Sequence, residues 1–318
     1  LSDSDPIMEI LPEDLAGKRL DQALAQLFPQ YSRSRLTQWV RDGRVLVDGE
    51  VLKPKDKVLG GEEISLEPEV EADTQFQAED IPLNIVYEDE GIIIINKPPG
   101  LVVHPAAGNW SGTLQNGLLF HDPELAKVPR AGIVHRLDKE TSGLMVVART
   151  LEAHTSLVTQ LQERTVKREY LALVQGQVIS GGMVDEPIGR HPVDRKRMAV
   201  VASGKPAITH YLIEERFEGY TLLRVSLETG RTHQIRVHMA HIRFPMVGDP
   251  VYGGRARTPA GLSEEVREAI LKFPRQALHA TRLGLVHPVT GEEMQWEAPL
   301  PEDMQELLSF MREHLPNA

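Results

Sequence analysis

The chain has 318 residues, of which 25% are charged and 41% are hydrophobic, and its formal net charge is −11. This length allows one large domain or two smaller domains with buried cores. The absence of cysteine excludes disulfides, thiol catalysis and cysteine-ligated zinc or iron–sulfur sites. No apolar run approaches the roughly 20 residues of a membrane helix, and the N-terminal residues lack the pattern of a secretory signal. We therefore expect a soluble, cytoplasmic protein with no membrane partner.

The negative charge is concentrated in one segment. Residues 62–90 contain 11 acidic residues and no lysine or arginine, so the rest of the chain is neutral. Within that rest, residues 18–61 carry a net charge of +4 and residues 91–289 carry +7. Because local charge governs nucleic-acid binding more than net charge does, both basic regions are compatible with an RNA or DNA partner.

The first basic region predicts two short helices followed by a hairpin. Apolar residues repeat at helical spacing over residues 20–27 and 36–40. Asp48-Gly49, between the apolar runs 45–47 and 51–52, is typical of a two-residue hairpin turn. The polar face of the second helix carries Arg33, Arg41 and Arg44. These arginines form either a solvated basic face or an RNA-binding surface.

The domain boundaries follow from composition. We expect a flexible tail over residues 1–11, a small α/β domain over 12–66, an exposed acidic linker over 67–80 and a larger domain over 81–318. The larger domain mixes apolar strands with amphipathic helices and shows no repeat, which favours an α+β fold on a mixed, mainly antiparallel sheet with flanking helices. Its strands are expected near residues 92–95, 144–148, 170–174, 207–212 and 222–227, and its helices over 150–162 and 304–311.

Motifs for phosphate and metal binding are weak. The chain has neither P-loop spacing nor a G-x-G-x-x-G pattern. The histidines at 233, 238 and 241 allow a metal interpretation, but no His-Glu-x-x-His pattern supports zinc. His238 and His241 can share a helix face, whereas His233 lies five residues earlier. A basic helix that faces an anion is therefore the favoured interpretation.

The segment 132–144 runs from an apolar strand into a densely charged loop and back into an apolar strand. Catalytic groups commonly lie on loops that rigid strands hold in place. Asp138 in this loop is a candidate catalytic residue, although an isolated aspartate here also fits a turn or capping role.

Several motifs occur along the chain in an order that is typical of one protein family. The chain contains His135-Arg136-Leu137-Asp138 and Thr141-Ser142-Gly143-Leu144, with Asn96-Lys97-Pro98-Pro99-Gly100 upstream and Lys167-Arg168-Glu169-Tyr170, Arg231-Thr232-His233-Gln234-Ile235-Arg236 and Gly248-Asp249-Pro250-Val251-Tyr252-Gly253 downstream. This series resembles the RNA pseudouridine synthases of the large-subunit ribosomal class. The N-terminal motifs Arg19-Leu20-Asp21, Ser32-Arg33-Ser34-Arg35 and Gly43 to Gly49 resemble the small RNA-binding domain named after ribosomal small-subunit protein four.

The resemblance implies a site-specific isomerisation of uridine to pseudouridine in 23S (large-subunit) ribosomal RNA. Asp138 would act as the nucleophile or as the base toward the sugar, and the residues alone leave both open. Arg236 would pair with the aspartate, and Tyr170 would stack on the target base. Arg136 would fill the space that the flipped base leaves. Further base-flipping or RNA contacts are expected at His135, Arg33, Arg35, Arg41, Arg44, Lys97, Arg231 and His233.

Phosphate contacts are expected from a further set of basic residues: Arg195, Lys196, Arg197, Arg243, Arg255 and Arg257. The reaction gains no electrons, water or group, so we expect no cofactor and no metal. The expected partner is large-subunit ribosomal RNA or the assembling large subunit, and the protein is expected to be a monomer that supports large-subunit maturation.

Two other functions fit parts of the sequence. A hydrolytic glycosylase also attacks the anomeric carbon beside a carboxylate, but it releases the free base. A non-catalytic RNA-binding or ribosome-assembly protein would explain the N-terminal region alone, and it gives Asp138 no chemical role.

Overall fold

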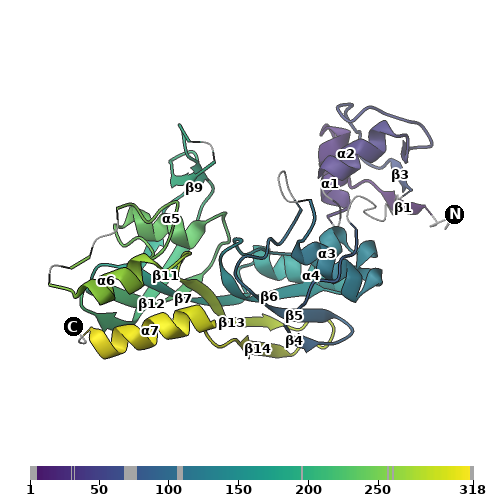
Figure 1. Ribbon diagram of the computed structural model, residues 1–318. Helices are drawn as coiled ribbons and strands as arrows, with labels where there is room; N and C mark the ends of the chain where they lie inside the picture. Colours follow the sequence, from purple (N-terminus) through teal and green to yellow (C-terminus); the bar gives the residue numbers. More distant parts are fainter. Residues whose placement is uncertain are drawn as a thin grey trace. The chain divides into compact units, whose positions relative to one another are not determined.

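The computed structural model describes residues 6–29, 31, 33–67, 77–105, 110–194, 196–255, 258–259 and 261–315 (Figure 1). The chain divides into two compact units, Leu1–Ala72 and Asp73–Ala318. None of the helices in these described ranges is long and apolar enough to cross a membrane.

The first unit is a small helical pair on a three-stranded sheet. Helices α1 (Leu20–Leu27) and α2 (Arg33–Arg41) bury the apolar stripes that the sequence predicted. The sheet has the order β1 (Ile7–Ile10), β3 (Glu63–Leu66) and β2 (Val45–Val47), and a 3₁₀ turn covers Glu13–Leu15. One apolar cluster, which includes Leu24, Leu36 and Trp39, joins these elements into a core.

One expectation for this unit is wrong, and another is confirmed only in part. Residues 7–10 of the expected flexible tail form β1, because their backbone pairs in antiparallel register with β3; residues 1–5 lie outside the described part of the chain. Asp48-Gly49 does form a turn, and both residues have positive φ. The turn is closed by an antiparallel bridge between Val47 and Glu50, as in a two-residue hairpin. The pairing does not continue into residues 51–52, and the strand partner of β2 is β3.

The second unit is built on a nine-stranded mixed sheet in which the β13–β6 pair is parallel and the other strand pairs are antiparallel, as expected. Its strands are β4 (Ile85–Glu88), β5 (Ile92–Lys97), β6 (Ser142–Ala148), β7 (Lys167–Gln175), β8 (Gly182–Asp185), β11 (Ile208–Phe217), β12 (Tyr220–Leu227), β13 (Leu278–Val286) and β14 (Glu293–Glu297). A separate hairpin consists of β9 (Ile188–Arg190) and β10 (Met198–Val200).

Helices cover both faces of this sheet, which explains the continuous apolar run at 92–95: alternate isoleucines enter different cores. One core includes residues of α3 (Leu114–His121) and α5 (Gln234–His241). The cores of the opposite face include residues of α4 (Leu151–Gln162), α6 (Glu264–Leu271) and α7 (Glu302–His314). Helix α7, yellow in Figure 1, lies along this sheet. Short 3₁₀ turns cover Pro123–Lys127 and Pro129–Gly132.

The end of the expected acidic linker belongs to the second unit. The Gln77 carbonyl accepts a hydrogen bond from Asn116 Nδ2, and the Glu79 carboxylate accepts one from the Gly112 backbone N–H. Residues 77 and 79 are therefore attached at the start of α3, so the second unit includes residues before 81, although residues 77, 78 and 80 are exposed as expected of the linker. Residues 68–76 lie outside the described part of the chain.

Gly143 provides a test of how β6 meets β13. Its φ is +117°, and an added Cβ would lie 2.2 Å from the carbonyl oxygen of Ala280 on β13. We predict that Gly143→Ala lowers the free energy of unfolding by about 3 kcal/mol or more, measured by urea denaturation. Gly291→Ala is the matched control, because Gly291 also has positive φ but no atom near an added Cβ. Equal losses in both variants would contradict the prediction.

Candidate active site

Asp138 lies in the loop that precedes β6, at a cavity of about 580 Å³ in the second unit. The cavity is lined by the three residues expected to be catalytic, Asp138, Tyr170 and Arg236, although they come from three separate parts of the chain. It is rich in arginine, since its lining also includes Arg130, Arg136, Arg164, Arg168 and Arg231. A polar cavity of this size and charge suits an anionic ligand as large as a nucleotide.

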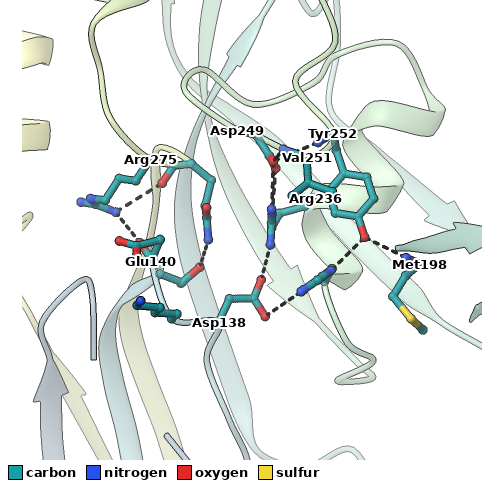
Figure 2. A network of polar contacts seen from close by, with 12 residues as sticks. Asp138, Glu140, Met198, Arg236, Asp249, Val251, Tyr252 and Arg275 are labelled. Atoms are coloured by element: carbon teal, nitrogen blue, oxygen red, sulfur yellow. Dashed lines mark hydrogen bonds and ion pairs between the residues drawn. The ribbon is translucent and has the colours of Figure 1, made fainter. Parts of the chain in front are cut away.

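The Arg236 guanidinium binds two carboxylates at once (Figure 2). Its Nη1 donates to Asp138 Oδ2 at 3.0 Å. Its Nε and Nη2 donate to the two oxygens of Asp249, at 2.7 and 2.9 Å. The Asp249 side chain is fully buried, and the Arg236 side chain is only 5% exposed. Asp249 therefore fixes the plane of the guanidinium, and Arg236 in turn orients the Asp138 carboxylate.

The electrostatics of this triad follow from burial and pairing. Burial alone would raise the pKa of Asp249, but the hydrogen bonds and charge of Arg236 and the backbone N–H groups of Val251 and Tyr252 lower it. Burial would likewise lower the pKa of Arg236, but Asp249 and Asp138 raise it. Both Asp249 and Arg236 are therefore charged across the pH range in which enzymes work.

His233 approaches the other oxygen of Asp138, with Nε2 3.8 Å from Oδ1. Its Nδ1 lies 2.8 Å from the Tyr252 hydroxyl, which accepts a hydrogen bond from the Met198 backbone N–H. Burial lowers the pKa of His233, which favours the neutral ring. In the neutral tautomer whose Nδ1 accepts a hydrogen bond from the Tyr252 hydroxyl, the Nε2–H group faces Asp138.

Tyr170 and Arg136 border the same cavity but differ in exposure. The Tyr170 ring is buried on β7, and burial raises the pKa of its hydroxyl. Arg136 is exposed, and it forms no hydrogen bond or ion pair with any residue in the described part of the chain. Tyr170 therefore offers a buried aromatic surface, and Arg136 offers a free cation at the rim of the cavity.

Residues 275–279, around the start of β13, contact the loop that carries Asp138. Arg275 Nη1 donates to the Glu140 carbonyl at 3.0 Å (Figure 2), and the same guanidinium forms a two-point ion pair with Asp303 at the start of α7. Gln276 Nε2 donates to Thr141 Oγ1 at 3.1 Å. These contacts connect the charged loop to α7 and to the start of β13.

Lys97 does not fit the expectation of an RNA contact. Its side chain is fully buried, and its Nζ donates to the carbonyl oxygens of Pro98, Leu101 and Lys139. Burial lowers the pKa of Lys97 to about 7. The expectation is therefore wrong: Lys97 joins its own turn to the residue that follows Asp138, and it has no surface to offer RNA.

His135 and Arg231 line the cavity and are also tied to the protein. His135 Nε2 accepts a hydrogen bond from the Val146 backbone N–H at 3.0 Å, and burial lowers the pKa of His135 to about 3, so the ring is neutral. Arg231 Nε donates to the Pro206 carbonyl. Both residues therefore contribute to the wall of the cavity, and both are partly exposed.

The basic residues of the first unit are not equivalent. Arg33 forms an ion pair with the buried Asp21 at 2.8 Å, and burial and pairing act in opposite directions on Asp21, with pairing to Arg33 and Arg19 holding its pKa below the usual value. Arg35 lies over the Trp39 ring. Arg41 is exposed, whereas Arg44 is half-buried and contacts other residues. Arg33 and Arg35 thus have structural contacts in addition to their exposed surface.

The residues that are expected to contact phosphates also differ in exposure. Lys196, Arg243 and Arg255 are exposed, whereas Arg197 is partly buried over the Tyr252 ring. Arg195 and Arg257 lie outside the described residues.

The three histidines considered for a metal are not arranged as ligands. His233 faces Tyr252 and Asp138, whereas both ring nitrogens of the buried His238 are engaged, by Thr209 and by the Glu186 carbonyl. Within the described ranges, no group of three or more His, Cys, Asp or Glu residues could hold a metal ion.

Asp249, Tyr252 and Arg275 are site residues to which sequence reasoning gave no role. The motif around Asp249 was recognised, but nothing in its spacing indicates that it binds Arg236. Arg275 lies in an ordinary segment before a strand, and its contact with Glu140 depends on the parallel pairing of β13 with β6.

Comparison with known proteins agrees with this geometry. Residues 91–241 match the family model for RNA pseudouridylate synthase, and residues 18–64 match the model for the S4 domain. The chain therefore belongs to the RNA pseudouridine synthases, which are isomerases that convert uridine to pseudouridine within RNA.

Its relatives include particular members of that family. The chain is 61% identical to "Ribosomal large subunit pseudouridine synthase D" of Pseudomonas aeruginosa, over 95% of both chains. It is also 61% identical to the protein of the same name from Escherichia coli K12, over 94% of this chain and 92% of the relative. A solved structure, "Human RNA Pseudouridylate Synthase Domain Containing 4", matches with a TM-score of 0.57 and 26% identity over 73% of this chain and 94% of that chain.

His279 gives a pH-dependent test of the support behind the loop. It is buried, its Nδ1 lies 2.9 Å from Ser142 Oγ, and burial lowers its pKa to about 4. Because histidine in the unfolded chain binds its proton near pH 6.5, the unfolded state holds more protons between pH 6.5 and about 4. The contribution of His279 to stability is therefore present above pH 6.5 and is lost as the pH falls through this window.

We predict that His279→Gln flattens the pH dependence of the unfolding free energy by about 3 kcal/mol across this window, measured by urea denaturation at several pH values. The exposed His314 provides the control, since His314→Gln should leave the slope unchanged. A wild-type slope in His279→Gln would show that this histidine is not held neutral.

Proposed function

We propose that this protein isomerises specific uridines to pseudouridine in 23S (large-subunit) ribosomal RNA, with Asp138 as the essential catalytic residue. The observation that carries the proposal is the Arg236 guanidinium, which binds the Asp138 carboxylate at the base of a cavity large enough for a nucleotide. The names and high identity of the relatives support the choice of substrate.

The chemistry requires a carboxylate beside the sugar. Isomerisation breaks the bond between N1 of the base and C1′ of the sugar, turns the base, and forms a bond between C5 and C1′. Asp138 serves either as the nucleophile at C1′ or as the base that removes a sugar proton. In both cases the carboxylate must be charged and oriented, and the contact with Arg236 supplies an opposite charge and a directed hydrogen bond.

The target uridine must leave its helical stack to reach Asp138, at a cost of a few kcal/mol. Tyr170 is buried on the cavity wall and suits a stacking contact with the flipped base. Arg136 is exposed two residues before Asp138 and suits the space that the base leaves. Both roles are part of the proposal.

The two parts of the chain would have separate roles, which follow from the family models that they match. Residues 12–66 would dock on folded ribosomal RNA, and residues 81–318 would flip and isomerise the uridine. The S4 match supports an RNA-binding role for the first unit. We further propose that the protein acts in the cytoplasm as a monomer on large-subunit RNA or on the assembling subunit, without a nucleotide cofactor.

Asp138→Asn tests the reaction directly. The variant keeps the size of the side chain but removes its charge, so we predict that pseudouridine formation falls by at least about a thousandfold. The RNA affinity should stay within about threefold, because phosphate contacts dominate it. Pseudouridine is measured in RNA incubated with excess enzyme, and Asp80→Asn, an exposed aspartate of the same unit, should retain wild-type activity.

The other outcomes identify the alternatives. Free uracil among the products would indicate a hydrolytic glycosylase. Binding without either product would indicate a non-catalytic RNA-binding protein, and pseudouridine formation by Asp138→Asn would show that another residue is essential.

Arg41 tests the role of the first unit. It is exposed on α2, so we predict that Arg41→Gln weakens RNA binding and reduces the salt dependence of the affinity by about one phosphate contact. Binding is measured at several salt concentrations, and Lys272→Gln, at an exposed lysine directly after α6, is the control. An unchanged affinity and salt slope would remove Arg41 from the RNA-binding surface.

A further inference from the structure

Arg168 is a buried arginine of the cavity wall to which the mechanism above gives no role. It lies on β7, two residues before Tyr170, so both side chains are on the same face of the strand. Both line the cavity, and the charge of Arg168 acts on Tyr170 and on His135. Only 7% of Arg168 is exposed.

The hydrogen bonding of Arg168 is incomplete. Its Nη2 donates to the Glu228 carbonyl at 3.2 Å, whereas its buried Nε has no partner. No carboxylate in the described part of the chain forms an ion pair with it. Burial accordingly lowers the pKa of Arg168.

Two other buried arginines show the contrast. Arg236 and Arg275 each form a two-point ion pair with an aspartate, Asp249 and Asp303 respectively. A buried cation without such a partner is costly and is strongly attracted to an incoming negative charge. Arg168 is therefore prepared for a ligand rather than for a partner within the fold.

Gly230 leaves space for this guanidinium. A Cβ at residue 230 would lie 2.8 Å from Arg168 Nη1. The φ of Gly230 is not in the left-handed region, so the backbone accepts other residues here, but a side chain at 230 would displace the Arg168 guanidinium from its present position. Gly230 also lines the cavity, one residue before Arg231.

We propose that Arg168 is a catalytic residue that binds the negatively charged oxygens of the uracil ring while the base is detached from the sugar. This inference rests on the proposed function. When the N1–C1′ bond breaks, its electron pair stays with the base and spreads onto O2 and O4. After the base turns, C5 bonds to C1′, the C5 proton is lost and N1 gains a proton, so atoms and electrons balance.

A buried donor at this place stabilises charge that develops only during the reaction. Uridine bound in the ground state is neutral, whereas the detached base is an anion. Arg168 therefore stabilises the intermediate more than the substrate, which is the condition for accelerating the reaction. Its burial beside Tyr170 favours the ring over a backbone phosphate, since phosphates are most readily reached by exposed side chains such as Arg136.

The test compares two RNAs that carry uridine or 5-fluorouridine at the target position. Fluorine withdraws electrons, so the detached fluorinated base is a weaker base and needs less stabilisation. The measurement is the single-turnover rate at which the N-glycosidic nucleoside disappears from saturated enzyme. We expect Arg168→Gln to slow the uridine RNA by about 100-fold or more, to slow the 5-fluorouridine RNA at least tenfold less, and to leave the RNA affinity unchanged.

Further variants keep the test decisive. Arg282→Gln removes an arginine of the neighbouring β13 that pairs with Glu169 and Glu297, and it should react at the wild-type rate. If Arg168→Gln does not fold, Arg168→Lys and Gly230→Ala are measured instead; each should slow the uridine RNA more than the 5-fluorouridine RNA. Thermal unfolding establishes which variants are folded.

The contrary results are distinct. Equal slowing of both RNAs, with weaker binding and a smaller salt slope, would make Arg168 a phosphate contact. Wild-type rates in Arg168→Gln would make it structural. If the wild-type protein forms no pseudouridine, the proposed function itself fails; if Asp138→Asn is inactive but Arg168→Gln is not impaired, only this inference fails.

Discussion

The structure of the site depends on one buried guanidinium. Arg236 binds Asp249 through Nε and Nη2 and Asp138 through Nη1, so a single planar group carries two carboxylates. The first contact is fully inside the protein, and the second reaches the cavity. A buried charge without a partner is costly, and the ion pair with Asp249 offsets this cost for Arg236. Arg236 then fixes the direction in which the Asp138 carboxylate points.

The loop that carries Asp138 is held in place by hydrogen bonds from several neighbouring segments. Lys97 binds the Lys139 carbonyl, Arg275 binds the Glu140 carbonyl, and His135 accepts a hydrogen bond from β6. Buried donors thus satisfy two backbone carbonyls that follow Asp138, and the His135 ring connects the residues before it to β6, while the Asp138 side chain faces the cavity. Arg168 differs from these groups, because its hydrogen-bonding capacity remains partly unused within the fold.

Much of this arrangement was predictable from the sequence, for reasons that differ between elements. The helices α1, α2, α4 and α7 followed from the periodicity of their apolar residues, and the strand at 92–95 followed from its continuous apolar run. The pairing of β2 with β3 did not, because the competing partner at 51–52 is nearer in sequence. Lys97 resembled a surface cation, and only the tertiary structure reveals three carbonyl groups around it. The role of Asp249 likewise depends on a contact between segments that sequence spacing does not specify.

The geometry around Arg236 requires a guanidinium rather than another cation, and Arg236→Lys tests this requirement most directly. A lysine keeps the charge but cannot bind both carboxylates in fixed geometry. At saturating RNA, the single-turnover rate of pseudouridine formation should fall by about 100-fold or more while RNA affinity stays near wild type. A folded Arg236→Lys enzyme that forms pseudouridine at the wild-type rate would contradict the claim that this guanidinium orients Asp138.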